Sequence, residues 1–317
     1  MSRIRFHLGL FMLLLVWSAG SLAAKVQPKV AMPASLVGAW EEVGGGRQLN
    51  FETDRAIQRD GDKLTVRGLI QSETRSVPNR LVLRNNGLSE TWTFKIEKGL
   101  LTLEPTGSAQ EGDKKGAFRR LDRVPPDLKL ELLPVSAAKA LPPERIQAIQ
   151  KEIKDRFDAE QALFKSPSPP KDQIAEIQRN NLEYLTGLLK EVGWLDSARF
   201  GAKTSVQAVI MAKHTHDLRL MMTLLPYAER DLKDSGEGQT YAVLYDALQL
   251  ELGRKQLYGT QVAKDKHDGH LFVLPMEESK AQVNLRLTKM KLPSIDEYLK
   301  MVGQVYGQQV QCCRRDG

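Results

Sequence analysis

Histidines and a carboxylate gather in one short segment, His214-Thr215-His216-Asp217. Imidazole and carboxylate groups together transfer protons and bind zinc, so this segment is the first candidate for chemistry. Residues two apart on a helix point about 200° from each other, and residues 206–211 have a helical pattern. His214 and His216 therefore cannot hold one ion together, and we expect no metal site. His214 remains a candidate, either as a functional polar group or as a hydrogen-bonded structural histidine.

The sequence lacks the common signatures of catalysis and of cofactor binding. It contains no Gly-x-Ser-x-Gly nucleophile elbow, no phosphate-cradling glycine-rich loop, no dinucleotide fingerprint and no His-Glu-x-x-His helix. We therefore predict no bound cofactor, and the sequence leaves open whether the protein is an enzyme.

The histidine segment belongs to a half of the chain with helical periodicity. Ile146, Ile149, Ile153 and Phe157 recur at steps of three and four residues, which places them on one face of a helix. Further helical patterns cover residues 174–189, 205–213, 218–232, 241–252 and 295–302. Because the connections are short, neighbouring helices should pack antiparallel in an all-α bundle, which we predict over residues 143–303.

The preceding half has the periodicity of strands. Residues 63–69, 80–84 and 90–96 alternate polar and apolar side chains, and Gly61, Gly87 and Gly99 stand where tight hairpins need positive φ angles. We predict a small antiparallel β-barrel or sandwich over residues 34–122.

The opening of this β domain, Gly38-Ala39-Trp40, is similar to the Gly-x-Trp start of lipocalin-like domains. In such domains the tryptophan plugs one end of the barrel. We therefore expect Trp40 in the core, with a place in a ligand-binding wall as the alternative.

Prolines separate the two halves. Pro125-Pro126, Pro134 and Pro142-Pro143 forbid a continuous helix or a central strand, so residues 123–142 should be a linker or a strap. The predicted fold class is a two-domain α+β protein with its boundary near residue 130. Residues 304–317 should form a polar tail, in which the adjacent Cys312 and Cys313 cannot staple either domain, and their redox state stays open.

The N-terminus resembles a secretory signal peptide. It combines the basic Arg3 and Arg5, an apolar stretch over residues 8–17 and the small residues of Ser21-Leu22-Ala23. The apolar stretch has about ten residues, whereas a membrane-spanning helix needs about 20. We expect residues 1–23 to be removed, and the mature chain to be exported, periplasmic or extracellular, without a stable membrane span.

The charge pattern argues against nucleic acid as a partner. Lys and Arg number 46 against 39 Asp and Glu, for a formal net charge of +7. The two signs are interleaved and no block of five or more like charges occurs, so a stripe that could follow phosphates is missing. A small ligand or an envelope protein remains as the expected partner.

Several short motifs of the second half together resemble a bacterial family, the domain of unknown function 6624. In chain order they are Glu160-Gln161, Asn181 with Gly193-Trp194, His214, Asp246, Tyr258-Gly259-Thr260-Gln261 and Asp296-Glu297-Tyr298-Leu299. The resemblance covers roughly residues 144–303. It implies a helical domain, often behind a signal peptide, and it brings no established activity.

Carried over residue by residue, the resemblance supplies the candidate site. The candidate catalytic residues are Glu160, Gln161, His214 and Asp246, and the candidate binding residues are Asn181, Tyr258, Thr260 and Gln261. Because unpaired polar groups are costly inside a bundle, we expect His214, Asp246 and the Tyr258 to Gln261 loop to lie close together.

This chain departs from the family pattern at three positions. Lys213 stands where the family usually has Gln, His216 where it has Asp, and Ala247 where it has Arg. Each change alters the charge that a catalytic centre would have. The favoured function is therefore a non-catalytic, ligand- or partner-binding envelope module, and the alternative is a hydrolase-like enzyme with a polar site around His214 and Asp246.

Overall fold

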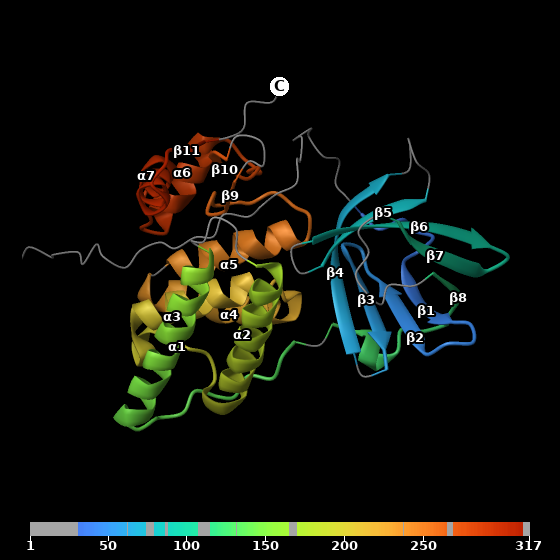
Figure 1. The fold of residues 1–317 in the computed structure, drawn as a ribbon, viewed down its shortest axis with the longest axis horizontal. Helices are drawn as coiled ribbons and strands as arrows, with labels where there is room; N and C mark the ends of the chain where they lie inside the picture. The colour runs from blue at the N-terminus through green and yellow to red at the C-terminus, as the bar shows by residue number, and fades with distance from the viewer. Residues whose placement is uncertain are drawn as a thin grey trace, which may run out of the picture.

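The computed structural model of the protein describes residues 31–61, 63–73, 79–85, 88–106, 115–130, 132–164, 170–236, 238–264 and 269–312. Figure 1 shows a barrel of strands beside a larger, mainly helical region. This arrangement confirms the predicted α+β fold class, with the β region before the α region. The signal peptide predicted at residues 1–23, and Cys313 in the tail, lie outside the described residues.

The first region is a closed antiparallel barrel, in which each strand pairs with the next and β8 pairs with β1. Its strands are β1 (Gly38–Glu42), β2 (Arg47–Phe51), β3 (Arg55–Asp60), β4 (Lys63–Glu73), β5 (Arg80–Asn85), β6 (Leu88–Glu97), β7 (Leu100–Thr106) and β8 (Gly116–Arg120). Gly61 and Gly99 have φ angles of 57° and 79°, as tight hairpins require, while Gly87 falls outside the described residues. Of the two predicted architectures, the barrel is the correct one.

The barrel core contains Trp40. Its side chain is 1% exposed and packs with inward-facing residues such as Leu49, Phe51 and Phe118. The indole Nε1 donates a hydrogen bond to the Leu36 carbonyl oxygen at 2.8 Å, and the Arg120 guanidinium lies over the ring at 5.4 Å from its centroid. Trp40 is thus the core residue that the sequence predicted.

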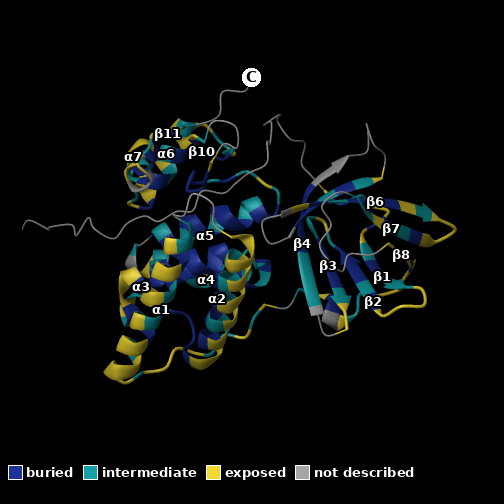
Figure 2. Ribbon diagram, viewed as in Figure 1, coloured by how far each residue is buried: buried dark blue, intermediate teal, exposed yellow. Residues whose placement is uncertain are grey.

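The second region is mainly helical. Its helices are α1 (Pro143–Phe164), α2 (Lys171–Val192), α3 (Ser197–His214), α4 (Leu218–Ser235), α5 (Gly238–Glu251), α6 (Lys280–Lys289) and α7 (Ile295–Tyr306). One apolar cluster runs through these helices, and Figure 2 shows buried residues inside both regions and exposed residues on their outer faces. No helix in the described part of the chain is long and apolar enough to cross a membrane.

Three short strands, two within the predicted all-α bundle and one after it, accompany the helices. They are β9 (Val262–Lys264), β10 (Leu271–Val273) and β11 (Val310–Gln311), and they form one sheet in the order β11-β10-β9. Strand β11 lies inside residues 304–317, where a polar tail was predicted, and its Val310 is buried. Strands of two or three residues are too short to show a period of two, so the sequence pattern could not reveal them.

Helices α1 and α3 lie beside each other and run parallel. Near their starts, Gln150 Nε2 donates to the Phe200 carbonyl oxygen at 3.0 Å. Near their ends, the Glu160 and His214 side chains are in contact. The C-terminal ends of both helices therefore bring their polar side chains together.

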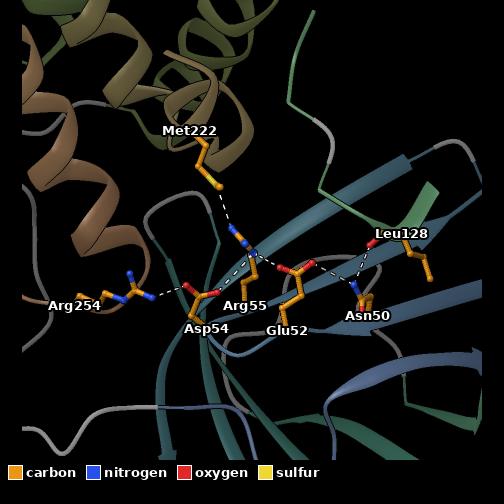
Figure 3. A network of polar contacts seen from close by, with 7 residues as sticks. All are labelled: Asn50, Glu52, Asp54, Arg55, Leu128, Met222 and Arg254. Carbon is orange, nitrogen blue, oxygen red and sulfur yellow. Dashed lines mark hydrogen bonds and ion pairs between the residues drawn. The ribbon is translucent and has the colours of Figure 1, made fainter. Parts of the chain in front are cut away.

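The proline-rich segment is a strap that is bound to both regions. A short 3₁₀ helix, η1 (Pro126–Leu128), packs on the barrel, where the Leu128 carbonyl oxygen accepts a hydrogen bond from Asn50 Nδ2 at 3.2 Å (Figure 3). Further along, Leu133 N donates to Thr223 Oγ1 on α4, and Ser136 N donates to the Leu189 carbonyl oxygen on α2. These hydrogen bonds connect residues 128–136 of the segment to both regions.

Polar side chains of the barrel also contact the helices directly. Figure 3 shows Arg254, which follows α5, paired with Asp54 at 2.5 Å between Nη2 and Oδ2. In the same view, Arg55 Nη1 contacts Met222 Sδ on α4 at 3.1 Å. The start of β3 and the residue before it therefore contact both α4 and the segment that follows α5.

Two glycines allow the backbones of the two regions to approach each other. A Cβ atom on Gly68 of β4 would lie 2.0 Å from the Glu251 carbonyl oxygen. Gly253 has a φ angle of 72°, and a Cβ atom there would lie 2.5 Å from Ile70 Cα. Because such contacts leave no room for a side chain, only glycine fits at either position.

Candidate functional site

A buried histidine–carboxylate pair lies where α1 and α3 end. His214 Nδ1 and Glu160 Oε2 are 2.7 Å apart, and Asn181 Nδ2 of α2 donates to Glu160 Oε1 at 3.3 Å. Glu160 is 0% exposed and His214 is 2% exposed. The Phe164 ring and the imidazole pack in a T-shaped arrangement, with ring centroids 5.6 Å apart. Three residues of the candidate site are therefore joined in one hydrogen-bonded group.

Several buried polar atoms on this pair and on residues of α1, α2 and α3 have no partner. His214 Nε2, Gln161 Nε2 and Asn181 Oδ1 make no hydrogen bond with the described residues. The same holds for Gln207 Oε1, which lies on the same face of α3 as His214, two turns earlier. An unpaired buried polar group costs about 1 to 3 kcal/mol, so each such group calls for an explanation.

Lys213 adds a buried cation to this group. Its side chain is 8% exposed, and in the described part of the chain its ammonium makes no hydrogen bond or ion pair. Its charge acts on both Glu160 and His214. We call Glu160, Gln161, Asn181, Lys213 and His214 the His214 cluster.

Burial shifts the proton equilibria of the His214 cluster. It raises the pKa of the Glu160 carboxyl to about 8, and it lowers the pKa of the Lys213 ammonium to about 7. Burial and the nearby Lys213 hold the pKa of the His214 imidazole well below its usual range. His214 is therefore neutral near pH 7, while Glu160 and Lys213 change charge close to that pH.

His216 forms a separate pair. Its Nδ1 lies 2.6 Å from Oε1 of Glu251, at the end of α5, and its backbone has a φ angle of 53°, which is uncommon outside glycine. Glu251 also favours the charged form of Arg84, on the barrel. His214 and His216 thus have different carboxylate partners, and no group of three or more metal-ligating side chains lies together among the described residues.

A second buried cluster surrounds Asp246. Its carboxylate accepts hydrogen bonds from the backbone N–H groups of Leu257, Tyr258 and Thr260 at 2.7, 3.0 and 2.9 Å, and from Thr260 Oγ1 at 2.8 Å. Burial raises the pKa of the Asp246 carboxyl to about 6, and these hydrogen bonds oppose the shift. Asp246 therefore fixes the conformation of the loop.

Gln261, the last candidate binding residue of this loop, is also held by hydrogen bonds. Gln261 Nε2 donates to the Val243 carbonyl oxygen at 3.2 Å and to Thr260 Oγ1 at 2.8 Å. Tyr298 Oη donates to the Thr260 carbonyl oxygen at 2.6 Å. We call Asp246, Tyr258, Thr260 and Gln261 the Asp246 cluster.

His214, Asp246 and the Tyr258 to Gln261 loop were expected to lie close together. The Tyr258 to Gln261 loop lies against Asp246, as predicted. No hydrogen bond or ion pair of the described residues connects His214 with Asp246, because His214 faces α1 and Asp246 faces the loop after α5. The candidate residues therefore form two clusters instead of one.

The sequence analysis did not predict that Lys213 and Glu251 belong to these polar groups. Lys213 had drawn notice only as a departure from the family pattern. Glu251 lies 35 residues from its partner His216, so only the packing of α5 against the end of α3 brings them together. A polar residue in an apolar helix stretch was the one available signal for either residue.

The extent of the second region coincides with a known family. The model of a family of unknown function (DUF6624) matches residues 126–311 of this chain. The chain belongs to this family. The match begins at η1 and ends at β11, so the DUF6624 domain includes the strap and the small sheet in addition to the predicted residues 144–303. No curated protein and no solved structure matches the chain.

Both polar clusters lie inside the DUF6624 domain, whereas the barrel precedes it. The chemistry that these clusters permit therefore belongs to the DUF6624 domain itself. The Asp246 cluster can hold a loop in place. The His214 cluster can offer donors, one acceptor and a cation to a molecule that reaches it.

Proposed function

We propose that the protein is an exported, non-catalytic envelope module whose DUF6624 domain binds a small polar ligand at the His214 cluster. The features of residues 1–23 support export to the periplasm or the extracellular space. The observation that carries the binding function is a set of buried atoms without partners on His214, on Asn181, which is bonded to Glu160, and on Gln161, which follows Glu160 in α1: His214 Nε2, Asn181 Oδ1 and Gln161 Nε2.

The composition of the His214 cluster supports recognition of a polar molecule. Gln161 Nε2 is a donor, Asn181 Oδ1 is an acceptor, and His214 Nε2 is either one, depending on its tautomer. A ligand with complementary groups would satisfy all three atoms at once. Each of them is unfavourable without a partner, so binding would recover free energy that folding alone does not.

A hydrolase-like activity is the second candidate, and one observation favours it. Glu160 Oε2 lies 2.7 Å from His214 Nδ1, while Nε2 has no partner, which is the arrangement of an imidazole held by a carboxylate for general base catalysis. Asp246 does not join this arrangement, because its carboxylate already accepts hydrogen bonds from the loop. The burial of both side chains favours binding over hydrolysis of a large substrate.

The binding function is tested by thermal unfolding of the mature chain in the presence of small polar metabolites. A ligand of the native state raises the melting temperature by mass action. We expect this shift in the wild-type protein and its loss in Gln161→Leu, with no loss in the control Gln147→Leu, which changes an exposed glutamine of the same helix. If no compound shifts the wild-type protein, or if Gln161→Leu responds as the wild type does, the binding function at this cluster is wrong.

The enzyme alternative is tested separately, by measuring substrate turnover. Ester, amide, phosphoester and glycoside substrates are incubated with the wild-type protein and with His214→Asn and Glu160→Gln. Turnover by the wild type that both variants lose would establish the hydrolase in place of the binding module. Turnover that survives both changes would come from elsewhere and would remove this candidate.

A further inference from the structure

Lys213 is a buried cation that no group of the described chain neutralises by direct contact. Lysine is almost never fully buried unless it is paired, because an ammonium loses most of its hydration inside a protein. Lys213 is 8% exposed and has neither a hydrogen bond nor an ion pair in the described residues. Lys213 is therefore a mostly buried lysine whose ammonium contacts no anion of the described residues.

Glu160 is the acid whose charge acts on Lys213, but its carboxylate is hydrogen-bonded to other residues. Its Oε2 contacts His214 Nδ1 at 2.7 Å, and its Oε1 accepts from Asn181 Nδ2 at 3.3 Å. Both carboxylate oxygens thus have a neutral partner, and the Lys213 ammonium is not within ion-pair distance of either. The attraction between Lys213 and Glu160 acts only through space.

We propose that the His214 cluster binds the carboxylate of a small hydroxy acid or amino acid, with Lys213 as its counter-ion. Gln161 Nε2 and His214 Nε2 are the two further donors that a carboxylate can use, and Asn181 Oδ1 is the acceptor for the hydroxyl or amino group. This inference rests on the proposed function and gives the binding site its ligand class.

The protonation of the cluster sets the pH range of binding. At pH 6, below the pKa values of about 7 for Lys213 and about 8 for Glu160, Lys213 is charged and Glu160 is protonated. Glu160 then donates to His214 Nδ1, which leaves an N–H group on Nε2. At pH 9 Lys213 is neutral and Glu160 is negative. The cluster therefore changes from cationic to anionic between these pH values, and carboxylate affinity should fall.

The groups around Lys213 do not reverse this direction. The titratable neighbours that act on the cluster are Glu160 from α1, with His214 and His216 from the end of α3. His214 is neutral across the range, and His216 is paired with Glu251. Asn181 from α2 is uncharged. Lys213 and Glu160 both make the cluster more negative as the pH rises.

The test uses isothermal titration calorimetry of the full mature chain with lactate and with its neutral isostere lactamide, at pH 6 and pH 9. Charged hydrogen bonds are worth about 1.5 to 3 kcal/mol, so we expect wild-type protein at pH 6 to bind lactate at least about tenfold more tightly than lactamide. Lys213→Gln, which introduces the usual family residue, should remove that preference and leave lactamide affinity within about twofold. Lys203→Gln, at an exposed lysine of the same helix, should change neither affinity.

The outcomes separate this inference from the proposed function. If lactamide binds the wild-type protein as tightly as lactate does, the carboxylate class is wrong and the binding function stands. If inorganic phosphate binds more tightly than lactate, the site is a general anion site and the inference is also wrong. If neither lactate nor lactamide binds, the inference fails, while the metabolite panel decides the proposed function independently. Lys213→Met repeats the test without a polar replacement, and it should also lose the preference for lactate.

Discussion

The carboxylate of Asp246 and the imidazole of His214 are both buried in the DUF6624 domain, but they differ in how many of their polar neighbours have partners. Asp246 accepts hydrogen bonds from three backbone N–H groups and one hydroxyl. In the His214 cluster, His214 Nε2, Gln161 Nε2 and Asn181 Oδ1 have none in the described chain. A complete network is sufficient for a structural role, whereas an incomplete one needs a partner from outside the chain.

The barrel offers a third case, which shows that this chain can complete a buried charged network. Inside the barrel, Arg67 Nε donates to Glu90 Oε2 at 2.6 Å and Arg67 Nη1 donates to Gln58 Oε1 at 3.2 Å. Trp92 Nε1 donates to the same Glu90 oxygen at 3.3 Å, and the Arg67 guanidinium lies over the Trp92 ring. The Arg67 side chain thus has charged and polar partners inside the barrel, whereas three polar atoms of the His214 cluster have none in the described chain.

The largest expected effect is on the complete network. Asp246→Ala leaves the N–H donors of the loop without an acceptor and should lower the free energy of unfolding by about 3 to 5 kcal/mol. Urea denaturation, followed by the circular dichroism signal of the helices, measures this loss. The control Asp158→Ala, which removes an exposed ion pair with Lys154, should cost less than about 1 kcal/mol. A loss of similar size in both variants would show that the Asp246 cluster has no special structural role.

A smaller effect of opposite sign is expected at the unpartnered cation. Lys213→Gln should raise the free energy of unfolding at pH 6 by about 1 to 3 kcal/mol in ligand-free protein, because a buried unpaired charge is removed. The pKa of Lys213 is lowered from 10.5 to about 7 in the folded state, so its cost is complete below pH 7 and disappears as the pH rises toward 10.5. The advantage of the variant over the wild type should therefore shrink between pH 7 and pH 10.

Denaturation curves of wild type, Lys213→Gln and Lys203→Gln over this pH range provide the measurement. Lys203 is exposed on the same helix, so its variant should follow the wild type at every pH. A Lys213→Gln variant that is less stable than the wild type at pH 6 would mean that Lys213 already has a stabilising partner. That result would end the contrast between the two clusters.

The smallest expected effect is the coupling between the clusters. Because no hydrogen bond or ion pair joins His214 to Asp246 in the described residues, the losses from His214→Ala and Asp246→Asn should add within about 0.5 kcal/mol in a double-mutant cycle. The same cycle with His214→Ala and Glu160→Gln, whose side chains touch, should show a coupling of about 0.5 to 3 kcal/mol. Strong coupling in the first cycle would restore the single network expected from the sequence.

Local periodicity was sufficient to predict most of the architecture. Alternation with a period of two over residues 63–69, 80–84 and 90–96 predicted strands, and turn glycines such as Gly99 predicted the hairpins that connect them. The helical period and the prolines predicted the second region and the segment before it. These features depend on neighbours along the chain, which is why a single sequence contains them.

The association of Asp246 with its loop was also predictable. Polar residues without an evident local partner must find one inside a bundle, and the family pattern placed Asp246 and Tyr258 to Gln261 among such residues. The same argument extended to His214, whose hydrogen-bond partner is Glu160 of α1. The cost of burying a polar group demands a partner, but it does not specify which one.

Tertiary structure alone decided the composition of the His214 cluster. Glu160 and His214 are 54 residues apart, and they meet because α1 and α3, which are not consecutive helices, lie side by side and run parallel with aligned ends. Tertiary packing also determines the burial of Lys213 and the pairing of β11 with β10. A helical period shows which face of a helix is apolar, but the packing of the whole domain determines which faces meet and which polar atoms are left without partners.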